Sequence, residues 1–399
     1  MRFILAVVCL VVGWVQACCS AAVSATEAPR PSVEMRGTLA LPDDAPDGDG
    51  NRVRLTGISG VAWLAADRYV AVLDNSDRLL FFTLDLSRTG EPLAVRDLRV
   101  VRVAAVHDFE DVAVCPAPLR ERIAARATRR DGDDPGDCLL LAEEDTPAVR
   151  AVSQRGGDLL GVVPLPEVMR GRRPNRGLES LAVDPDDGSI WTANEEALTG
   201  DGPNACMDAG TVVRLVRIPL PADPPLPTRQ YAYAVDAPHA FVRVFAGEPL
   251  SGVVAVAALG AGRLLVLERA AGPGVPPFMN RLYLVSTAQA ADVADVERDL
   301  AARADLRLPK HLLWEDALGC NLEGLCLGPP LAGGGRALVG VADNGGLGTP
   351  NQLVGLVLVP PPRRHAATVI GAGIVLAVLV AVAVVALPLW RRGGRLTSP

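Results

Sequence analysis

The chain has 399 residues, with 39 Lys+Arg against 46 Asp+Glu and a formal net charge of −7 at pH 7. This balance excludes a nucleic-acid-binding protein that relies on a generally basic surface, and 49% hydrophobic residues exclude an intrinsically disordered chain. Lys310 is the only lysine, which argues against a lysine-dependent active site. Glycine (39) and proline (33) are frequent, so short elements joined by many turns are favoured over long helices.

The amino-terminal residues have the pattern of an export signal. Arg2 precedes an apolar run over residues 3–17, and small residues follow it. Val23 and Ala25 suit the −3 and −1 positions of a signal-peptidase site, so residues 1–25 are predicted to be a signal peptide cleaved after Ala25. An uncleaved membrane anchor and a lipid-modified Cys18 remain alternatives.

The carboxy-terminal residues predict a membrane anchor. Residues 366–390 contain no charged side chain, and at 1.5 Å per residue a helix of this length reaches ~37 Å, enough to cross ~30 Å of hydrocarbon. Together with the export signal, this segment predicts a single-pass membrane protein. Its ectodomain (residues 26–362) would lie on the extracytoplasmic side, with a cytoplasmic tail at residues 391–399.

The exported body contains five cysteines, and export permits disulfides. Cys115 ends one strand-like run and Cys138 begins the next, so these two are the best candidates for an intramolecular pair.

A strand–turn–strand unit recurs along the body, with starts near residues 57, 109, 175, 251 and 321. A third strand often follows, as at residues 79–84, 211–218, 281–286 and 352–359. Degenerate β repeats of this kind predict an all-β fold, a β-propeller, although a β-sandwich is the alternative. Six blades are preferred and five are possible, the sixth being assembled from residues 33–41 and 231–244. The best helix candidate is an insertion at residues 288–304.

The first strand of each propeller blade lines the central channel. The repeats therefore predict that Ser59, Glu110, Glu179, Ser251 and Glu323 lie at equivalent depths around the axis. A second set of acidic residues closes the second strands and is expected near one rim: Asp74, Glu143, Glu144, Glu195, Glu196, Glu268 and Asp343.

Converging carboxylates repel one another unless a cation neutralises them. Calcium accepts six to eight oxygen ligands, so the pattern predicts a Ca²⁺-lined funnel that binds an anionic group. Arg176, Arg269 and Arg281 are expected to add forked contacts to that anion. The alternative is that the acids cap strand ends and bind nothing. Other chemistries are disfavoured, because the sequence has no G-x-S-x-G, no H-E-x-x-H and no phosphate-binding G-x-x-x-x-G-K motif.

An ordered set of motifs resembles the phytase-like family, which is described as having esterase-like activity of phytase. The motifs lie at residues 175–182, 191–196, 264–269, 280–283 and 321–325, and the resemblance covers about residues 33–360. It implies a β-propeller, export and calcium-assisted phosphoester hydrolysis. The sequence departs from the family pattern at Asp111, where glycine is expected, and at Gly345-Gly346, where an aromatic residue is expected.

Together these features predict an exported, membrane-anchored hydrolase of a small anionic phosphoester. Two alternatives stay open, a non-catalytic propeller that binds a protein or glycan and a lactonase-like esterase. The predicted catalytic residues are Glu179, Glu196, Glu268 and Glu323. The predicted substrate-binding residues are Arg176, Asn194, Arg269, Arg281 and Asn321. The predicted metal ligands are Glu110, Glu179, Glu195, Glu323 and Asp343.

Overall fold

The computed structural model describes residues 30–103, 108–126, 138–155, 157–220, 226–317, 319–344 and 350–361. The predicted signal peptide, transmembrane helix and cytoplasmic tail lie outside these residues. Within the described ranges, none of the helices has the length and apolar character needed to traverse a bilayer. Residues 31–359 form one compact unit.

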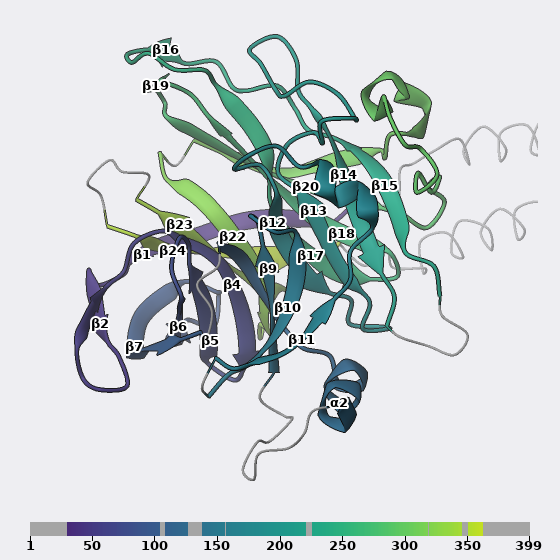
Figure 1. Cartoon of the computed structure of the whole chain (residues 1–399). Helices are drawn as coiled ribbons and strands as arrows, with labels where there is room; N and C mark the ends of the chain where they lie inside the picture. Colours follow the sequence, from purple (N-terminus) through teal and green to yellow (C-terminus); the bar gives the residue numbers. More distant parts are fainter. Residues whose placement is uncertain are drawn as a thin grey trace, which may run out of the picture. The chain divides into compact units, whose positions relative to one another are not determined.

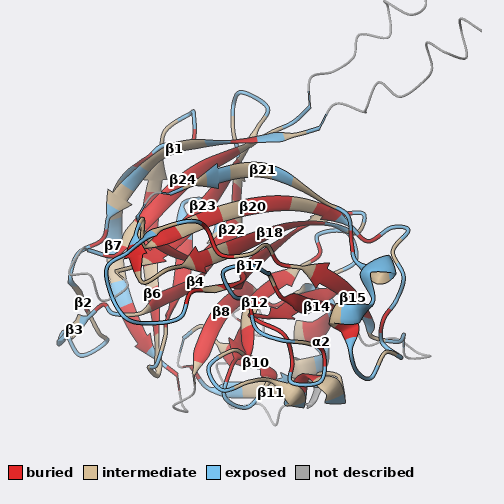
Figure 2. Ribbon diagram, turned by 90° about the horizontal axis from the view of Figure 1, so that it is seen from above, coloured by how far each residue is buried: buried red, intermediate tan, exposed pale blue. Residues whose placement is uncertain are grey.

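This unit is a β-propeller of five four-stranded antiparallel blades (Figures 1 and 2). Its innermost strands, which neighbour one another around the axis, are β4 (Ile58–Ala65), β8 (Phe109–Val114), β12 (Leu178–Val183), β17 (Leu250–Gly260) and β22 (Asn321–Pro330). The second strands are β5 (Arg68–Leu73), β9 (Cys138–Glu143), β13 (Ile190–Asn194), β18 (Arg263–Ala271) and β23 (Arg336–Asp343). The third strands are β6 (Arg78–Leu86), β10 (Ala148–Ser153), β14 (Val212–Ile218), β20 (Phe278–Ser286) and β24 (Gln352–Val359). The outermost strands are β7 (Pro92–Arg102), β11 (Leu159–Val163), β15 (Arg229–Ala234), β21 (Lys310–Asp316) and β1 (Ser32–Ala40).

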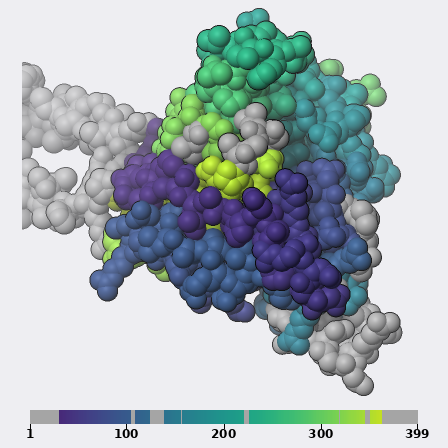
Figure 3. Space-filling model, turned by 90° about the vertical axis from the view of Figure 1, so that its left-hand side faces the viewer, coloured from purple at the N-terminus to yellow at the C-terminus, as the bar shows by residue number. Residues whose placement is uncertain are grey.

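The preference for six blades is wrong. The two segments assigned to a sixth blade complete other blades: β15 is the outer strand of the third blade, and β1 pairs with β24 in the fifth. Figure 3 shows the segments near the two ends of the propeller, β1 in purple and β24 in yellow, side by side on the surface. Residues 33–41 supply only β1, and residues 231–244 supply most of β15 and the two-residue β16 (Val242–Arg243), so neither segment has the strands of a separate blade. A strand without a blade of its own satisfies its backbone groups by joining an existing edge.

Smaller elements decorate the ring. Two short ribbons pair β2 (Asp44–Pro46) with β3 (Arg52–Arg54), and β16 (Val242–Arg243) with β19 (Gly274–Val275). The helical elements are α2 (Ala117–Arg126) and the 3₁₀ turns η1 (Glu167–Gly171), η2 (Leu300–Ala302) and η3 (Ala304–Leu306).

The helix expected at residues 288–304 is not formed. The Asp292 carboxylate accepts hydrogen bonds from the backbone N–H groups of Gln230 and Ala294 (both 3.0 Å), and Val293 N–H donates to the Gln230 carbonyl (2.8 Å). An aspartate that binds nearby backbone offers the chain an alternative to the helix. The segment is therefore held against β15.

Apolar side chains fill the contacts between neighbouring blades. One buried cluster lies between each adjacent pair, including the first and fifth blades, where Leu80 and Phe82 pack with Val339 and Leu353. Strand β9 is buried at every position, which explains why it reads as a continuous apolar run instead of an alternating one. The ring is thus closed by hydrophobic burial on both faces of every blade.

The strand directions give the propeller two different faces. Inner strands begin, and second strands end, at the face carrying Glu110 and Asp74. The paired residues Ser32 and Val359 lie at the opposite edge, so both ends of the propeller leave away from the acidic face. Cys115 and Cys138 also lie toward that edge, where Cys115 N–H donates to the Cys138 carbonyl (3.1 Å); both side chains are free thiols.

Candidate functional site

Three inner strands each carry a β-bulge at a glutamate. The ladder skips Glu110 between Phe109 and Asp111, Glu179 between Leu178 and Ser180, and Glu323 between Leu322 and Gly324. A bulged residue is unpaired and its side chain is re-aimed. The bulges therefore turn all three glutamates into the mouth of the channel.

The fourth blade departs from this pattern, because its bulge lies at Val254 and not at Ser251. Ser251 is fully buried, and Val254 occupies the position of the glutamates. The expectation of equal depth holds for the glutamates of the second, third and fifth blades.

The second strands place another ring of charges beside the first. In each blade, the last inner-strand residue before the bulge pairs with a residue near the end of the second strand. The residue that follows this partner is acidic in four blades: Asp74, Glu144, Glu195 and Asp343. By the same register, the fourth blade contributes Arg269. Four blades thus supply a carboxylate to this ring and one supplies a guanidinium.

The two rings enclose a cavity of about 320 Å³. We call this cavity the acidic funnel. Its lining includes two guanidinium groups, from Arg176 and Arg269, against seven carboxylates: Asp74, Glu110, Glu144, Glu179, Glu195, Glu323 and Asp343. An excess of carboxylates in a confined space is tolerated only when protons, arginines or a cation offset it.

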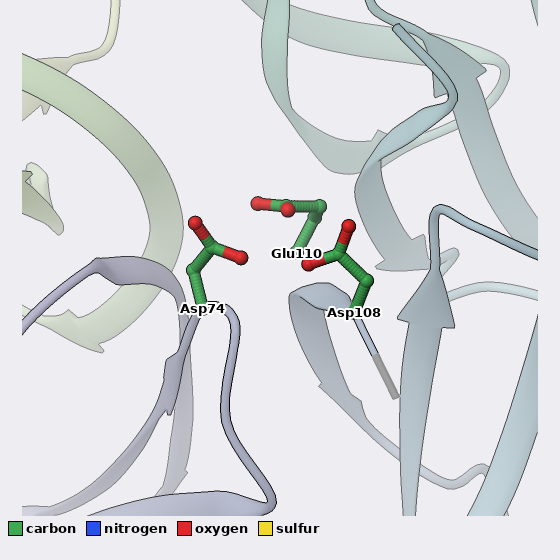
Figure 4. A group of neighbouring side chains, drawn as sticks. All are labelled: Asp74, Asp108 and Glu110. Carbon is green, nitrogen blue, oxygen red and sulfur yellow. The ribbon is translucent and has the colours of Figure 1, made fainter. Parts of the chain in front are cut away.

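Two groups of carboxylates share Glu110. One oxygen from each of Asp74, Asp108 and Glu110 lies within 4.8 Å of the others, and the same holds for Glu110, Glu144 and Glu179. In Figure 4 the side chains of Asp74 and Asp108 point toward Glu110 from neighbouring blades. Glu110 therefore stands where the two oxygen clusters meet.

Burial and mutual repulsion raise the pKa values of these acids. The pKa of Glu110 lies well above its usual range, first because of desolvation and then because of the charges of Glu179 and Asp74. Desolvation also raises the pKa of Glu179, aided by Glu195 and Glu144. The Asp74 pKa rises to about 6 and the Glu144 pKa to about 7, both chiefly through burial. The unliganded funnel therefore holds protons at neutral pH.

Two arginines line the funnel together with the carboxylates. Arg269 donates from Nη1 to Asn321 Oδ1 and from Nη2 to Glu195 Oε1 (both 2.9 Å), and its Nη2 lies 3.5 Å from Glu323 Oε2. Arg176 Nη1 lies 3.1 Å from Glu195 Oε2. Burial raises the pKa of Glu323 to about 7, although the Arg269 charge opposes this. Glu323 is thus an acid poised near neutrality beside a fixed cation.

The donor set fits a hard divalent cation such as calcium. The clusters offer carboxylate oxygens alone, which calcium prefers, and contain neither thiolate nor imidazole. Asp74 Oδ1, Asp108 Oδ1 and Ser59 Oγ are buried and have no hydrogen-bond partner. Orphaned buried oxygens are costly unless a ligand or water satisfies them. Asp74, Asp108, Glu110, Glu144 and Glu179 are the residues that would hold the ion.

Two predicted site residues lie outside the funnel lining. Glu268 accepts hydrogen bonds from the Tyr233 hydroxyl (2.6 Å), Lys310 Nζ (2.5 Å) and Asp236 N–H (3.0 Å), in a buried network between the third and fourth blades. Arg281 pairs with Glu315 at 2.7 Å and donates to the Ala237 carbonyl at 3.1 Å. Glu268 precedes Arg269 in a strand, so the two side chains point to opposite sides.

Three further predicted site residues, Glu196, Asn194 and Asn321, contact residues around the funnel without lining it. Glu196 Oε2 lies 3.3 Å from Arg176 Nε. Asn194 is fully buried, and its Oδ1 accepts a hydrogen bond from Arg214 N–H (3.0 Å). Asn321 accepts from Arg269 and donates to Glu323. They position the charged groups and do not line the cavity.

Among the predicted metal ligands, Glu110 and Glu179 fall in the oxygen clusters of the described residues. Glu195, Glu323 and Asp343 line the funnel without joining either cluster. Asp74, Asp108 and Glu144 belong to the oxygen clusters but are not among the predicted metal ligands. The sequence could have indicated Asp74 and Glu144, because both directly follow a second strand of the repeat. Asp108 precedes its strand, where the repeat has no recurring acidic position.

Comparison with solved structures finds other chains at low similarity. A streptogramin B lyase has a TM-score of 0.29 and 11% identity over 84% of this chain and 100% of that one. A periplasmic gluconolactonase of Pseudomonas aeruginosa has a TM-score of 0.34 and 13% identity over 84% and 98%. The tail fibre of Staphylococcus aureus phage P68 has a TM-score of 0.37 and 7% identity over 83% and 53%.

No curated protein matches the sequence. The family model "Phytase-like", described as esterase-like activity of phytase, matches residues 53–346, well over half of the chain and the whole ring of acids described above. The chain therefore belongs to the phytase-like family.

Proposed function

We propose that the acidic funnel is the active site of a calcium-assisted ester hydrolase that acts on a small anionic ester, a phosphomonoester in the first instance. The observation that carries the proposal is the convergence of Glu110, Glu144 and Glu179, whose oxygens lie within 4.8 Å of one another in a cavity of about 320 Å³. Family membership supports the same chemistry, although fold and family alone do not fix a reaction.

The funnel residues fall into two groups, those that would hold the cation and those that would contact the substrate. Bound calcium would polarise the phosphoryl oxygen as a Lewis acid. Glu179 and Glu110 would hold the ion, and Arg176 and Arg269 would present their guanidinium groups to substrate oxygens. Seven carboxylates would repel an anionic ester from the unliganded funnel, so substrate binding depends on the cation.

Glu323 is the candidate general base. Its pKa of about 7 lets the carboxylate accept a proton from an attacking water at neutral pH, which is the range in which general bases are most effective. Asn321 and Arg269 fix its orientation. The hydrolysis would form a bond between the water oxygen and phosphorus and break the bond between phosphorus and the ester oxygen. The proton accepted by Glu323 would pass to that ester oxygen, which leaves as the alcohol.

The test uses the purified chain with p-nitrophenyl phosphate and p-nitrophenyl acetate, with calcium or a chelator. We expect calcium-dependent hydrolysis, with Glu179→Gln raising the calcium concentration required and Glu323→Gln lowering the rate even at saturating calcium. Calcium-dependent cleavage of the acetate alone would favour a carboxylester or lactone substrate. A chain that binds calcium and hydrolyses neither ester would contradict the proposal and favour a binding propeller.

The cellular arrangement is also a proposal. Export through residues 1–25 and anchoring through residues 366–390 would tether the propeller to the extracytoplasmic side of the membrane. Protease accessibility of the propeller in intact cells, and its retention in washed membranes, would test this arrangement.

A further inference from the structure

The channel has a second chamber at its other end. Three residues beyond the funnel positions Ser59, Glu110, Glu179, Val254 and Glu323, every inner strand has a small side chain: Ala62, Ala113, Ala182, Ala257 and Cys326. These five residues line a cavity of about 420 Å³, which we call the vestibule. No residue lines both the vestibule and the acidic funnel.

A buried carboxylate lies between the two chambers. Asp111 is 1% exposed and accepts hydrogen bonds from Val112 N–H (2.8 Å) and from Leu181 N–H of the neighbouring blade (2.7 Å). A Cβ atom at Gly60 would come within 2.3 Å of Asp111, so the first blade packs directly on this residue. Asp111 therefore ties inner strands together at the waist of the channel, at the position where the sequence departs from the family pattern.

The vestibule and the funnel have opposite electrostatic character. Among the described residues, the vestibule lining contains no carboxylate and two arginines, Arg120 and Arg336, whereas the funnel lining contains seven carboxylates. The remaining vestibule lining is largely apolar, with Trp63 at its edge. Burial raises the pKa of the Cys326 thiol, so the fifth small residue is also neutral.

Arg336 has N–H donors available for a ligand. Within the described part of the chain, its Nε donates to the Gly328 carbonyl (3.0 Å), and no carboxylate lies within salt-bridge distance of it. A half-buried guanidinium beside apolar walls recognises a carboxylate through paired N–H groups. Cavities of 300–1,000 Å³ with mostly apolar walls and a few placed polar groups are typical of small-molecule sites.

We propose that the vestibule is a binding site for a small amphiphilic anion, a medium-chain carboxylate whose apolar chain enters between the small residues and whose carboxylate pairs with Arg336. The volume, the apolar walls and the guanidinium group of Arg336 all favour this class of ligand. A carboxylate would be repelled by the funnel, so the two chambers would discriminate between ligands. The site is independent of the proposed hydrolysis.

The experiment uses Trp63 as a reporter. The full chain, held in zwitterionic phospholipid vesicles, is titrated with decanoate brominated at the chain end, because bromine quenches nearby indole fluorescence. The signal is the difference between the wild-type chain and Trp63→Phe, which removes the contribution of the other tryptophans and of ligand in the bilayer. We expect saturable quenching, and binding about tenfold weaker for the equally brominated decyl alcohol.

Two variants separate charge from shape. Arg336→Gln is expected to weaken decanoate binding about tenfold, corresponding to loss of one charged contact, while leaving the alcohol unaffected. The matched control Arg263→Gln changes an exposed arginine outside the lining and should change nothing. Ala182→Leu should block both ligands; Ala257→Val is the milder substitute if the first variant lowers the melting temperature.

Each outcome decides the matter. Quenching that does not saturate would show that the vestibule takes no ligand, and the proposal would fall. Saturable binding that is equal for acid and alcohol, or unchanged in Arg336→Gln, would overturn the recognition of an anion. Loss of binding in Arg336→Gln with an unchanged melting temperature would support it.

Discussion

At the scale of single residues, Glu110 has the most consequential position. It belongs to both oxygen clusters, and the residue is only 8% exposed. Replacing it by glutamine removes a charge from each cluster at once while preserving shape. We expect Glu110→Gln to weaken calcium binding about tenfold or more, and to raise the melting temperature without calcium because like-charge repulsion falls. Isothermal titration calorimetry and thermal unfolding measure the two effects.

A useful comparison is Glu268→Gln, which makes the same chemical change in a buried glutamate outside the funnel. Here we expect calcium affinity to be unchanged. The free energy of unfolding should fall by about 1–3 kcal/mol, because Glu268 satisfies Lys310 and Tyr233 in a buried network. If Glu268→Gln instead abolished hydrolysis at normal stability, the catalytic role predicted for Glu268 from the sequence would be supported. The structural role assigned to it outside the funnel would then be wrong.

These residues also show what a sequence can and cannot assign. The motif around Glu268 and Arg269 indicated a charged strand end, but only the register shift at Val254 decides which of the two faces the channel. Asp108 lies before its strand and outside the repeat, so its partnership with Asp74 across two blades depends on long-range packing. Short-range patterns carry no information on either point.

At the scale of elements, the bulged inner strands depend on close approach between blades. A Cβ atom at Gly324 would lie 2.2 Å from the Ser59 carbonyl oxygen, which is backbone and has little freedom to move. We expect Gly324→Ala to lower the free energy of unfolding by about 1–3 kcal/mol, measured by urea denaturation. It should also lower the hydrolysis rate, since the candidate general base Glu323 lies next to the substituted residue and would shift.

Gly333→Ala is the matched control, because no heavy atom lies within 4 Å of a Cβ atom built at that turn glycine. Equal stability losses in the two variants would mean that general backbone flexibility, and not the contact between the first and fifth blades, explains the effect.

Repetition made most strands of this fold predictable. The five repeat starts correspond to β4, β8, β12, β17 and β22, since each unit has its own turn residues and apolar runs. The number of blades was not predictable, because β1 and β15 look alike in sequence whether they begin a new blade or finish an old one. The choice depends on which edge is unpaired, a property of the assembled ring.

At the scale of the whole molecule, the raised pKa values make stability depend on pH. The pKa values of Asp74 (about 6), Glu144 and Glu323 (both about 7) exceed those expected in the unfolded chain. The native state therefore binds more protons than the unfolded state between about pH 4.5 and 7. Stability from these groups is full below that window and is lost as the pH rises through it.

We therefore expect the free energy of unfolding without calcium to fall between pH 4.5 and 7.5, and added calcium to restore it most strongly at the upper end, where the carboxylates are ionised. Urea unfolding at several pH values, with a chelator or with calcium, measures both trends. A calcium-free chain that became more stable across this window would refute the crowding of the funnel acids.

The pairing of β1 with β24 also bears on how the protein is made. The strand over residues 32–40 leaves the ribosome early, whereas its partner over residues 352–359 is among the last parts of the propeller to emerge. Throughout synthesis each growing edge lacks its final neighbour, and such edges recruit strands from other chains. A message truncated before the last blade would therefore yield an aggregation-prone, protease-sensitive product instead of a functional propeller with fewer blades.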